Sequence, residues 1–183
     1  MDGFGGPIPL DDHSRRVARF AELAARELGL PDRIAGRIRL AGLLHDIGKS
    51  ELPAEILEKP GPLSPEQWHR LRQHPELGAR LLASPRFADI RGLVRAHHER
   101  VDGRGYPLGL EGAAIPIGAR IIAVADAYEA MTSDRPYRRA MDHEDAEEEL
   151  RACAGSQFDA DVVEAFLRVL RRERMRSLVG VAA

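Results

Sequence analysis

The sequence contains only one cysteine, Cys153, among its 183 residues. A single cysteine cannot form an internal disulfide, and this usage is typical of proteins from a reducing compartment. No stretch of about 20 apolar residues occurs, so we expect no membrane-spanning helix and no membrane insertion. Residues 1–12 lack a basic segment followed by an apolar run, so they predict no signal peptide. We therefore expect a cytoplasmic enzyme or binding domain.

The charges are nearly balanced, with 27 basic and 29 acidic residues and a formal net charge of -2. This balance argues against a partner that is a nucleic acid polymer bound through its phosphates, but it leaves room for a local basic site that binds one small anion. Hydrophobic residues make up 44% of the chain and charged residues 31%, which is ordinary for a globular protein. The length predicts one domain with a proper core.

Alternation of apolar and polar residues, the pattern of a half-buried strand, is not convincing anywhere, whereas helical periodicity is frequent. For example, Ile34, Ile38 and Ala41 share one helix face, and Ser64 is a good N-cap before Pro65. We expect an all-α bundle of about seven helices, over residues 17–28, 34–44, 64–82, 86–98, 118–131, 142–153 and 159–174. A glycine-rich loop is expected over residues 100–116.

Five of the seven histidines lie at helical spacing from apolar residues, on four expected helices. One histidine on an apolar face is usually a hydrogen-bonded core residue, but five need a common reason. Neutral imidazole is a good ligand for divalent transition metals, so we expect a metal site. These histidines are His13, His45, His74, His97 and His98. The other two, His69 and His143, are interpreted as ordinary surface residues.

Two aspartates strengthen this prediction. Asp46 directly follows His45, and Asp126 lies on the buried face of "ARIIAVADAYEAM". An unpaired buried carboxylate is costly, so Asp126 is expected either to bind a metal or to pair with an arginine. Six or seven ligands exceed the needs of one metal, and Asp46 could bridge two. Two divalent ions that hold a bridging hydroxide are a standard arrangement for hydrolysis of phosphate esters.

The motif "HDIGK" at residues 45–49, together with the spaced histidines and Asp126, resembles the HD superfamily of metal-dependent phosphohydrolases. The segments "HHERVDGRGYP", "IPIGARIIAVADAYEAMTSDRPYR" and "GSQFDADVVEAF" resemble its HD-GYP subgroup, which comprises bacterial phosphodiesterases that hydrolyse the second messenger cyclic di-GMP. The resemblance runs from His13 to about Leu170. It implies an HD-GYP domain at residues 13–175, between a short N-terminal tail at 1–12 and a C-terminal tail at 176–183.

The resemblance also implies roles for individual residues. One metal would be held by His13, His45, Asp46 and Asp126, and Asp46 would bridge to a second held by His74, His97 and His98. Besides Asp46, the catalytic residue would be Lys49, which would face the phosphate; the alternative is a solvated lysine after Gly48. The expected substrate-binding residues are Tyr106, Gly105, Glu129, Arg135 and Arg138. Tyr106 could instead pack back on the domain, and the two arginines could instead form salt bridges with the acidic helix.

The sequence departs from the family pattern at four places, of which Ala160, in place of a common proline after "QFD", is expected to be harmless. Pro9 stands where some relatives have a glutamate that supports a third metal, so we expect two metals. Glu129 stands where the family usually has aspartate, and its longer side chain could contact Arg135, the substrate or a residue that supports a metal ligand. Only twelve residues precede His13, where family domains usually carry a further helix, so His13 is expected to be weakly anchored or to need a partner.

The resemblance implies hydrolysis of cyclic di-GMP to pGpG and GMP with two divalent ions, iron or manganese rather than zinc. The alternatives are a phosphohydrolase that acts on another cyclic dinucleotide or nucleotide, and a catalytically decayed sensor or scaffold. No sensor domain is recognised in the sequence, so a signal is expected to come from a protein partner, such as a receiver or diguanylate cyclase domain, from the redox state of the metals or from the level of expression.

Overall fold

The computed structural model describes residues 11–134 and 139–180; Pro9, Arg135 and Arg138 lie outside these ranges. Within them no β-strand occurs, only two isolated bridges, so the expected all-α fold is confirmed. The α-helices are α1 (Asp12–Glu27), α2 (Asp32–Leu44), α3 (Ala54–Leu57), α4 (Pro65–Leu71), α5 (His74–Leu81), α6 (Ala88–Ala96), α7 (Ile117–Thr132), α8 (His143–Ala152) and α9 (Ala160–Gly180). The described helices are not long and apolar enough to cross a membrane.

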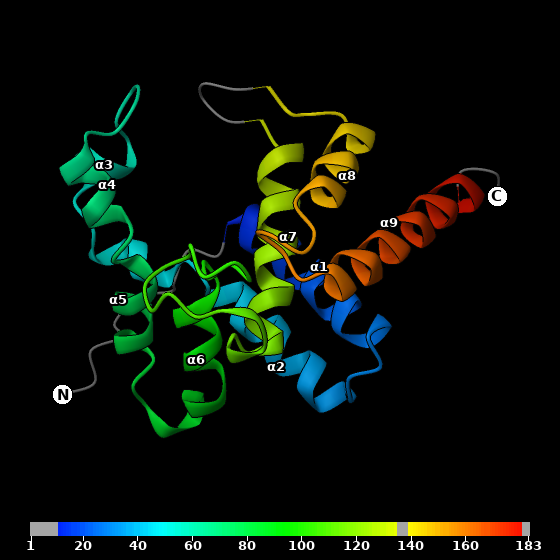
Figure 1. Cartoon of the computed structure of the whole chain (residues 1–183), viewed down its shortest axis with the longest axis horizontal. Coiled ribbons are helices and arrows are strands. Elements are labelled where there is room, and N and C mark those ends of the chain that lie inside the picture. The colour runs from blue at the N-terminus through cyan, green and yellow to red at the C-terminus, as the bar shows by residue number, and fades with distance from the viewer. Residues whose placement is uncertain (1–10, 135–138, 181–183) are drawn as a thin grey trace.

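Helix α7 lies at the centre of the molecule, with α1 and α9 on one side and α5 and α6 on the other (Figure 1). The face of α1 that meets α2 carries small residues, because Ala21, Ala24 and Ala25 are all fully buried. Small side chains allow two helix backbones to approach closely; a Cβ atom on Gly42 of α2 would lie 3.1 Å from the Ala18 Cα atom. Phe166 of α9 is fully buried and belongs to the same hydrophobic core as these alanines.

Two of the expected boundaries are wrong. The helix expected over residues 64–82 is two helices, α4 and α5, because the chain turns at Arg72 and Gln73. Pro75 lies in the first turn of α5 and cannot donate to a preceding carbonyl group, so a new helix starts there. The last helix extends beyond Arg174 to Gly180 and thus enters the segment expected to be a tail. The capping residue Ser64 is confirmed, since its side chain accepts a hydrogen bond from the Gln67 backbone at 3.3 Å.

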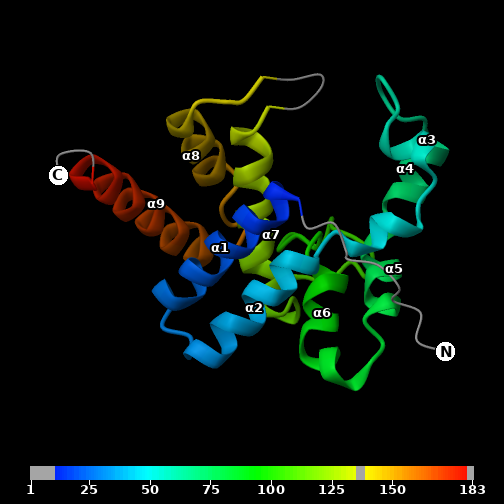
Figure 2. The same cartoon turned by 180° about the vertical axis from the view of Figure 1, so that it is seen from behind.

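Helices α3 and α4 form an arm that extends away from the bundle, as the two opposite views show (Figures 1 and 2). Helix α3 is an element that the sequence did not predict; it lies in the proline-rich segment between residues 52 and 65. The glycine-rich segment over residues 100–116 is a loop with one short 3-10 turn, η3 (Gly112–Ala114), as expected. The loop and α7 lie beside the helix ends that carry the clustered histidines.

Candidate metal centre

The clustered histidines and aspartates come mostly from the ends of helices. His13 lies in the first turn of α1, His45 and Asp46 follow the last residue of α2, and His74 begins α5. The other members, His97 and His98 at the end of α6 and Asp126 within α7, face the same place. Helix ends converge here because α6 packs against both α2 and α5, and α5 packs against the turn η1 that follows α2. Five helices thus bring together all seven residues predicted to hold metals.

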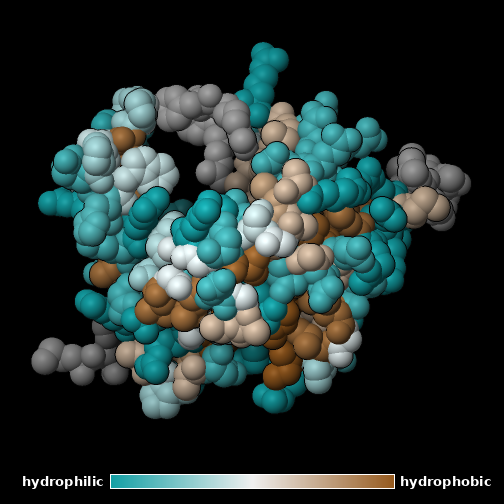
Figure 3. All heavy atoms as spheres, viewed as in Figure 1, coloured by the Kyte–Doolittle hydropathy of each residue, from teal (hydrophilic) through white to brown (hydrophobic). Residues whose placement is uncertain are grey.

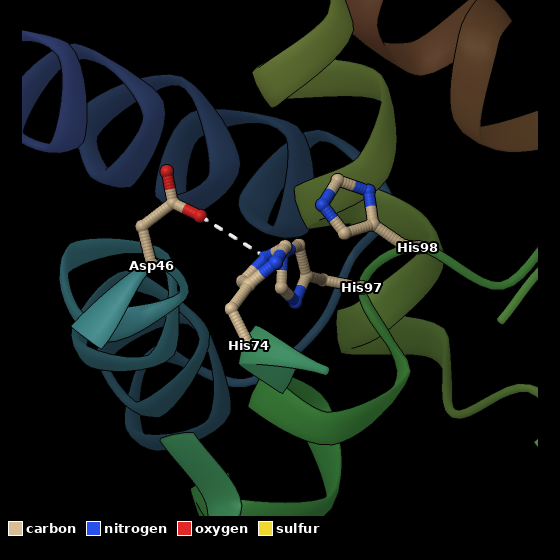
Figure 4. Close-up of side chains that lie close together, drawn as sticks. All are labelled: Asp46, His74, His97 and His98. Carbon is tan, nitrogen blue, oxygen red and sulfur yellow. Dashed lines mark hydrogen bonds and ion pairs between the residues drawn. The ribbon is translucent and has the colours of Figure 1, made fainter. Parts of the chain in front are cut away.

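The first group of ligand atoms contains Asp46, His74, His97 and His98, as Figure 4 shows. One ligand atom from each residue lies within 4.8 Å of all the others. The Nε2 atom of His74 is 3.2 Å from Asp46 Oδ1 and 3.4 Å from His97 Nε2. Three imidazoles and one carboxylate at these separations can surround a single divalent ion.

The second group contains His13, His45 and Asp46, again with ligand atoms within 4.8 Å of one another. Asp126 adjoins it, since its Oδ1 atom is 3.2 Å from His13 Nε2 and 3.7 Å from His45 Nε2. Asp46 belongs to both groups: its Oδ2 atom is 3.4 Å from His45 Nε2, and its Oδ1 atom faces His74. Each oxygen of this carboxylate therefore faces a different group, which is the geometry of a bridging ligand.

Three of the histidines are oriented by the same hydrogen bond. The Nδ1 atom of each lies 2.6–2.7 Å from the carbonyl oxygen three residues earlier. The three pairs are His45 with Gly42, His74 with Leu71 and His97 with Val94. A carbonyl oxygen can only accept, so Nδ1 carries the proton and the Nε2 lone pair points into the cluster. The backbone thus presets the tautomer that a metal requires.

Two buried polar atoms of the cluster have no hydrogen-bond partner in the described part of the chain, His45 Nε2 and Asp46 Oδ1. Burying such atoms without a partner is costly, and a cation bound by both atoms would account for their burial. The donor set of imidazoles and carboxylates is the one that iron, manganese and zinc share. The residues therefore fit a pair of divalent transition-metal ions.

The local pKa values favour metal binding at two of the histidines and oppose it at a third. Burial lowers the pKa of His98 to about 3 and holds that of His97 well below its usual range, so both rings are neutral. Burial acts in the same direction on His45, but Asp46 and Asp126 outweigh it and raise the pKa of His45 to about 9. A metal that binds His45 displaces that proton.

Lys49 lies in the 3-10 turn η1 (Ile47–Glu51), one turn beyond His45, and its Nζ atom donates a hydrogen bond of 2.5 Å to Asp46 Oδ2. Its side chain is 40% exposed, so the ammonium group lies between the cluster and solvent. The lysine is therefore attached to the cluster and not simply solvated. The two arginines predicted to bind substrate, Arg135 and Arg138, lie outside the described residues.

The loop after His98 returns to the cluster at Tyr106, whose ring stacks on the His98 ring with 4.8 Å between centroids and an interplanar angle of 28°. A Cβ atom on Gly105 would lie 2.5 Å from the Glu99 Cα atom, so only glycine allows this close approach. Tyr106 is only partly buried, and thus packs against a predicted ligand while keeping some exposure.

Two residues that the sequence did not single out also shape this loop. Glu99 is 4% exposed, and its carboxylate accepts hydrogen bonds from the backbone of Leu108 at 2.6 Å and of Leu110 at 3.0 Å. The guanidinium of Arg72 lies over the Tyr106 ring, 5.3 Å from its centroid. A charged residue next to two ligand histidines was a signal for Glu99; Arg72 gave none, because its position depends on the break between α4 and α5.

Glu129, predicted to bind substrate, is placed differently. It is 2% exposed and lies against the Nδ1 atom of His13, with additional bonds from Arg16 Nε at 2.6 Å and Ser133 Oγ at 2.6 Å. Its partner His13 is itself a predicted metal ligand, which is not among the contacts expected for the longer side chain, and Arg135 lies outside the described residues. Glu129 also anchors His13 within the described chain, where Asp11 caps α1 by accepting from Ser14 N at 2.8 Å.

A helical bundle that gathers five histidines and two aspartates in this way has the ligand set of a metal-binding domain. A sequence model of the HD domain matches residues 7–162, and the chain belongs to this family. Among solved structures, the chain is similar to an HDG"Y"P protein of Bdellovibrio bacteriovorus, Bd1817. That structure has a TM-score of 0.70 and 21% identity over 87% of this chain and 51% of the other, which shows a shared fold.

Curated relatives carry related names. The chain is 40% identical over 172 residues to a cyclic di-GMP phosphodiesterase of Thermotoga maritima, covering 88% of this chain and 47% of that protein. It is 38% identical over 158 residues to the 3'3'-cGAMP-specific phosphodiesterase 2 of Vibrio cholerae, covering 85% of this chain and 30% of that protein. The chain thus spans less than half the length of each of these relatives.

Proposed function

We propose that the chain is a metal-dependent phosphodiesterase that hydrolyses cyclic di-GMP to pGpG and then GMP. The observation that carries this proposal is the Asp46 carboxylate, whose two oxygens face two separate groups of ligands. Two such groups suit a reaction in which both the attacking and the leaving oxygen of a phosphodiester must be stabilised. The names of the curated relatives support the same reaction class.

The protein's residues would divide the work as follows. Bound divalent ions supply Lewis acidity and lower the pKa of water, which is the chemistry that phosphodiester hydrolysis needs. Asp46 holds Lys49 Nζ beside the cluster, where the ammonium group stabilises negative charge on the phosphate and can donate a proton to the leaving oxygen. Tyr106 contacts the nucleotide next to His98. The predicted roles of Arg135 and Arg138 in holding phosphate or guanine remain part of this proposal.

The identity of the metal, the cellular location and the signalling partner are also proposals. Imidazole and carboxylate ligands suit iron, manganese and zinc alike, so the proposal of iron or manganese rests on the resemblance to the family. A cytoplasmic location agrees with the single cysteine, and a receiver or diguanylate cyclase domain is the kind of signalling partner we expect.

A second candidate substrate is a mixed cyclic dinucleotide. The similarity to a relative named as specific for 3'3'-cGAMP favours it. A catalytically decayed sensor is less well supported, because the full set of predicted ligands and Lys49 lie together. Parallel assays with cyclic di-GMP and 3'3'-cGAMP separate these candidates, since a decayed sensor binds one of them without turnover.

The test compares Asp46→Ala with a surface control, His69→Ala, whose side chain is exposed on α4. We expect Asp46→Ala to lose metal and turnover together, and the control to keep both. Metal content is measured by elemental analysis and turnover by chromatography of the products. Turnover that persists in Asp46→Ala, or in wild-type protein treated with a chelator, would sink the proposal.

A further inference from the structure

The arm formed by α3 and α4 carries an exposed aromatic side chain, Trp68, which is 48% exposed. It is the only tryptophan of the chain. The described residues include three other exposed large apolar side chains, and two of these, Leu57 and Leu108, lie on α3 and on the loop that carries Tyr106. Exposed apolar side chains therefore gather on the elements around the metal centre, which is how nucleobase-binding surfaces are built.

Arg72 connects Trp68 to the metal centre. Its backbone N–H donates to the Trp68 carbonyl at 3.0 Å, so the two residues are one α-helical turn apart on the same side of α4. The Arg72 guanidinium lies over the Tyr106 ring, and the Tyr106 ring stacks on His98. A row of stacked groups thus leads from a predicted metal ligand to Arg72, and Trp68 lies one helical turn before Arg72 on the arm.

The charge of Arg72 is not neutralised by a carboxylate in the ranges that the structure describes. Arg95 of α6 shows the contrast, since its Nε atom lies 2.6 Å from Oε2 of Glu76. Arg72 instead rests on an uncharged ring and remains exposed. A planar guanidinium in this position is free to bind an anion while it stays stacked. Figure 3 shows the surface hollowed between the arm and the rest of the molecule.

We propose that Trp68 and Arg72 form a base-binding platform in which one purine ring of the cyclic dinucleotide stacks on the Trp68 indole. The Arg72 guanidinium then neutralises the phosphate between that base and the metal centre. This inference rests on the proposed function, because it names a subsite for the same substrate. Stacking suits the purine rings of either cyclic di-GMP or 3'3'-cGAMP, since every base has a π face. The platform therefore gives affinity for cyclic dinucleotides, without selecting among purines.

The sole tryptophan gives a direct binding assay. A hydrolysis-resistant phosphorothioate analogue of cyclic di-GMP is added to the metal-loaded protein, and tryptophan emission is recorded alongside calorimetric binding. We expect saturable quenching with the same midpoint as the calorimetric titration, because a stacked guanine quenches indole emission. Calorimetric binding with unchanged emission overturns the platform but leaves the proposed function intact.

Kinetics supply the second readout. Trp68→Ala and Arg72→Ala are each expected to raise KM for cyclic di-GMP about tenfold, the size expected for loss of one base–aromatic stack. In each variant, kcat/KM for cyclic di-GMP should fall about tenfold more than kcat/KM for methyl para-nitrophenyl phosphate, a phosphodiester without a base. Trp68→Phe should restore most of the affinity, and Arg72→Lys only part of it.

Met175→Ala is the matched control, because Met175 is 63% exposed on the distant helix α9 and the same apolar type of side chain is removed. It should have wild-type KM. If Trp68→Ala loses kcat/KM equally on both phosphodiesters, Trp68 serves folding and the platform is overturned. If that variant forms aggregates or dimers, Trp68 covers a protein contact and the platform is also overturned. Wild-type protein that neither binds nor cleaves a cyclic dinucleotide overturns the proposed function first.

Discussion

Replacing Gly48 by alanine introduces one methyl group where η1 meets the backbone of α5. The added Cβ would overlap the His74 carbonyl oxygen and the Gly78 nitrogen, and would lie 2.9 Å from the His74 carbonyl carbon. These are backbone atoms, so no side chain can rotate to make room. The helix that begins with a predicted metal ligand has to move.

Overpacking of this kind costs about 3 kcal/mol or somewhat more, since the typical range of about 1–3 kcal/mol includes sites that relax through side chains. For a chain of this length that corresponds to a fall in melting temperature of roughly 6–12 °C. Displacement of His74 should also weaken metal binding about 10- to 100-fold, as loss of a supporting contact to a ligand does.

The assay measures the melting temperature of metal-free protein by circular dichroism and metal affinity by titration. The matched control is Gly36→Ala, because Gly36 is exposed on α2 and no atom lies within 4 Å of the added Cβ. It should be more stable than wild type by about 0.5–1 kcal/mol. If Gly48→Ala keeps the wild-type melting temperature and binds two metals with wild-type affinity, the reasoning from this contact is refuted.

Three further predictions follow from the site. Glu129→Gln should weaken metal binding at His13 about 10- to 100-fold, because the charged partner of Nδ1 is lost; unchanged affinity in a metal titration contradicts this. Glu99→Gln should raise KM about tenfold with a smaller change in kcat, because an amide cannot accept both loop hydrogen bonds; loss of metal would instead indicate a general structural role. Burial raises the pKa of Tyr106 and Tyr128 above the value of about 10 in the unfolded chain, so their stabilising contribution is complete below pH ~10 and is lost as the pH rises above it. Phenolate absorbance should show both tyrosines titrating late and together with alkaline unfolding, not near pH ~10.

Helices could be predicted from the sequence where one apolar stripe runs through a whole element, as it does from Val17 to Ala24 in α1. The break between α4 and α5 could not be predicted from that pattern, because Leu71 and Gly78 keep helical spacing across it. Pro75 was the available signal, and it has the ambiguity that proline is allowed in a first turn but breaks a helix interior.

The ligand cluster could be predicted because histidine is conspicuous on an apolar face, and each of the five histidines is at least partly buried. The partners that orient those histidines could not, since the backbone carbonyls of Gly42, Leu71 and Val94 leave no trace in residue type. The same limit applies to Glu129, whose longer side chain reaches His13 only because α1 crosses α7 at that point.

The central claim is that two metals held around Asp46 cleave a cyclic dinucleotide. The most direct test is turnover of cyclic di-GMP by protein loaded anaerobically with Fe(II) or Mn(II), with metal content measured on the same sample. The account predicts two metals per chain together with the appearance of pGpG and GMP. Two metals without any product from cyclic di-GMP or 3'3'-cGAMP would contradict the proposed reaction, and fewer than two would contradict the dinuclear site itself.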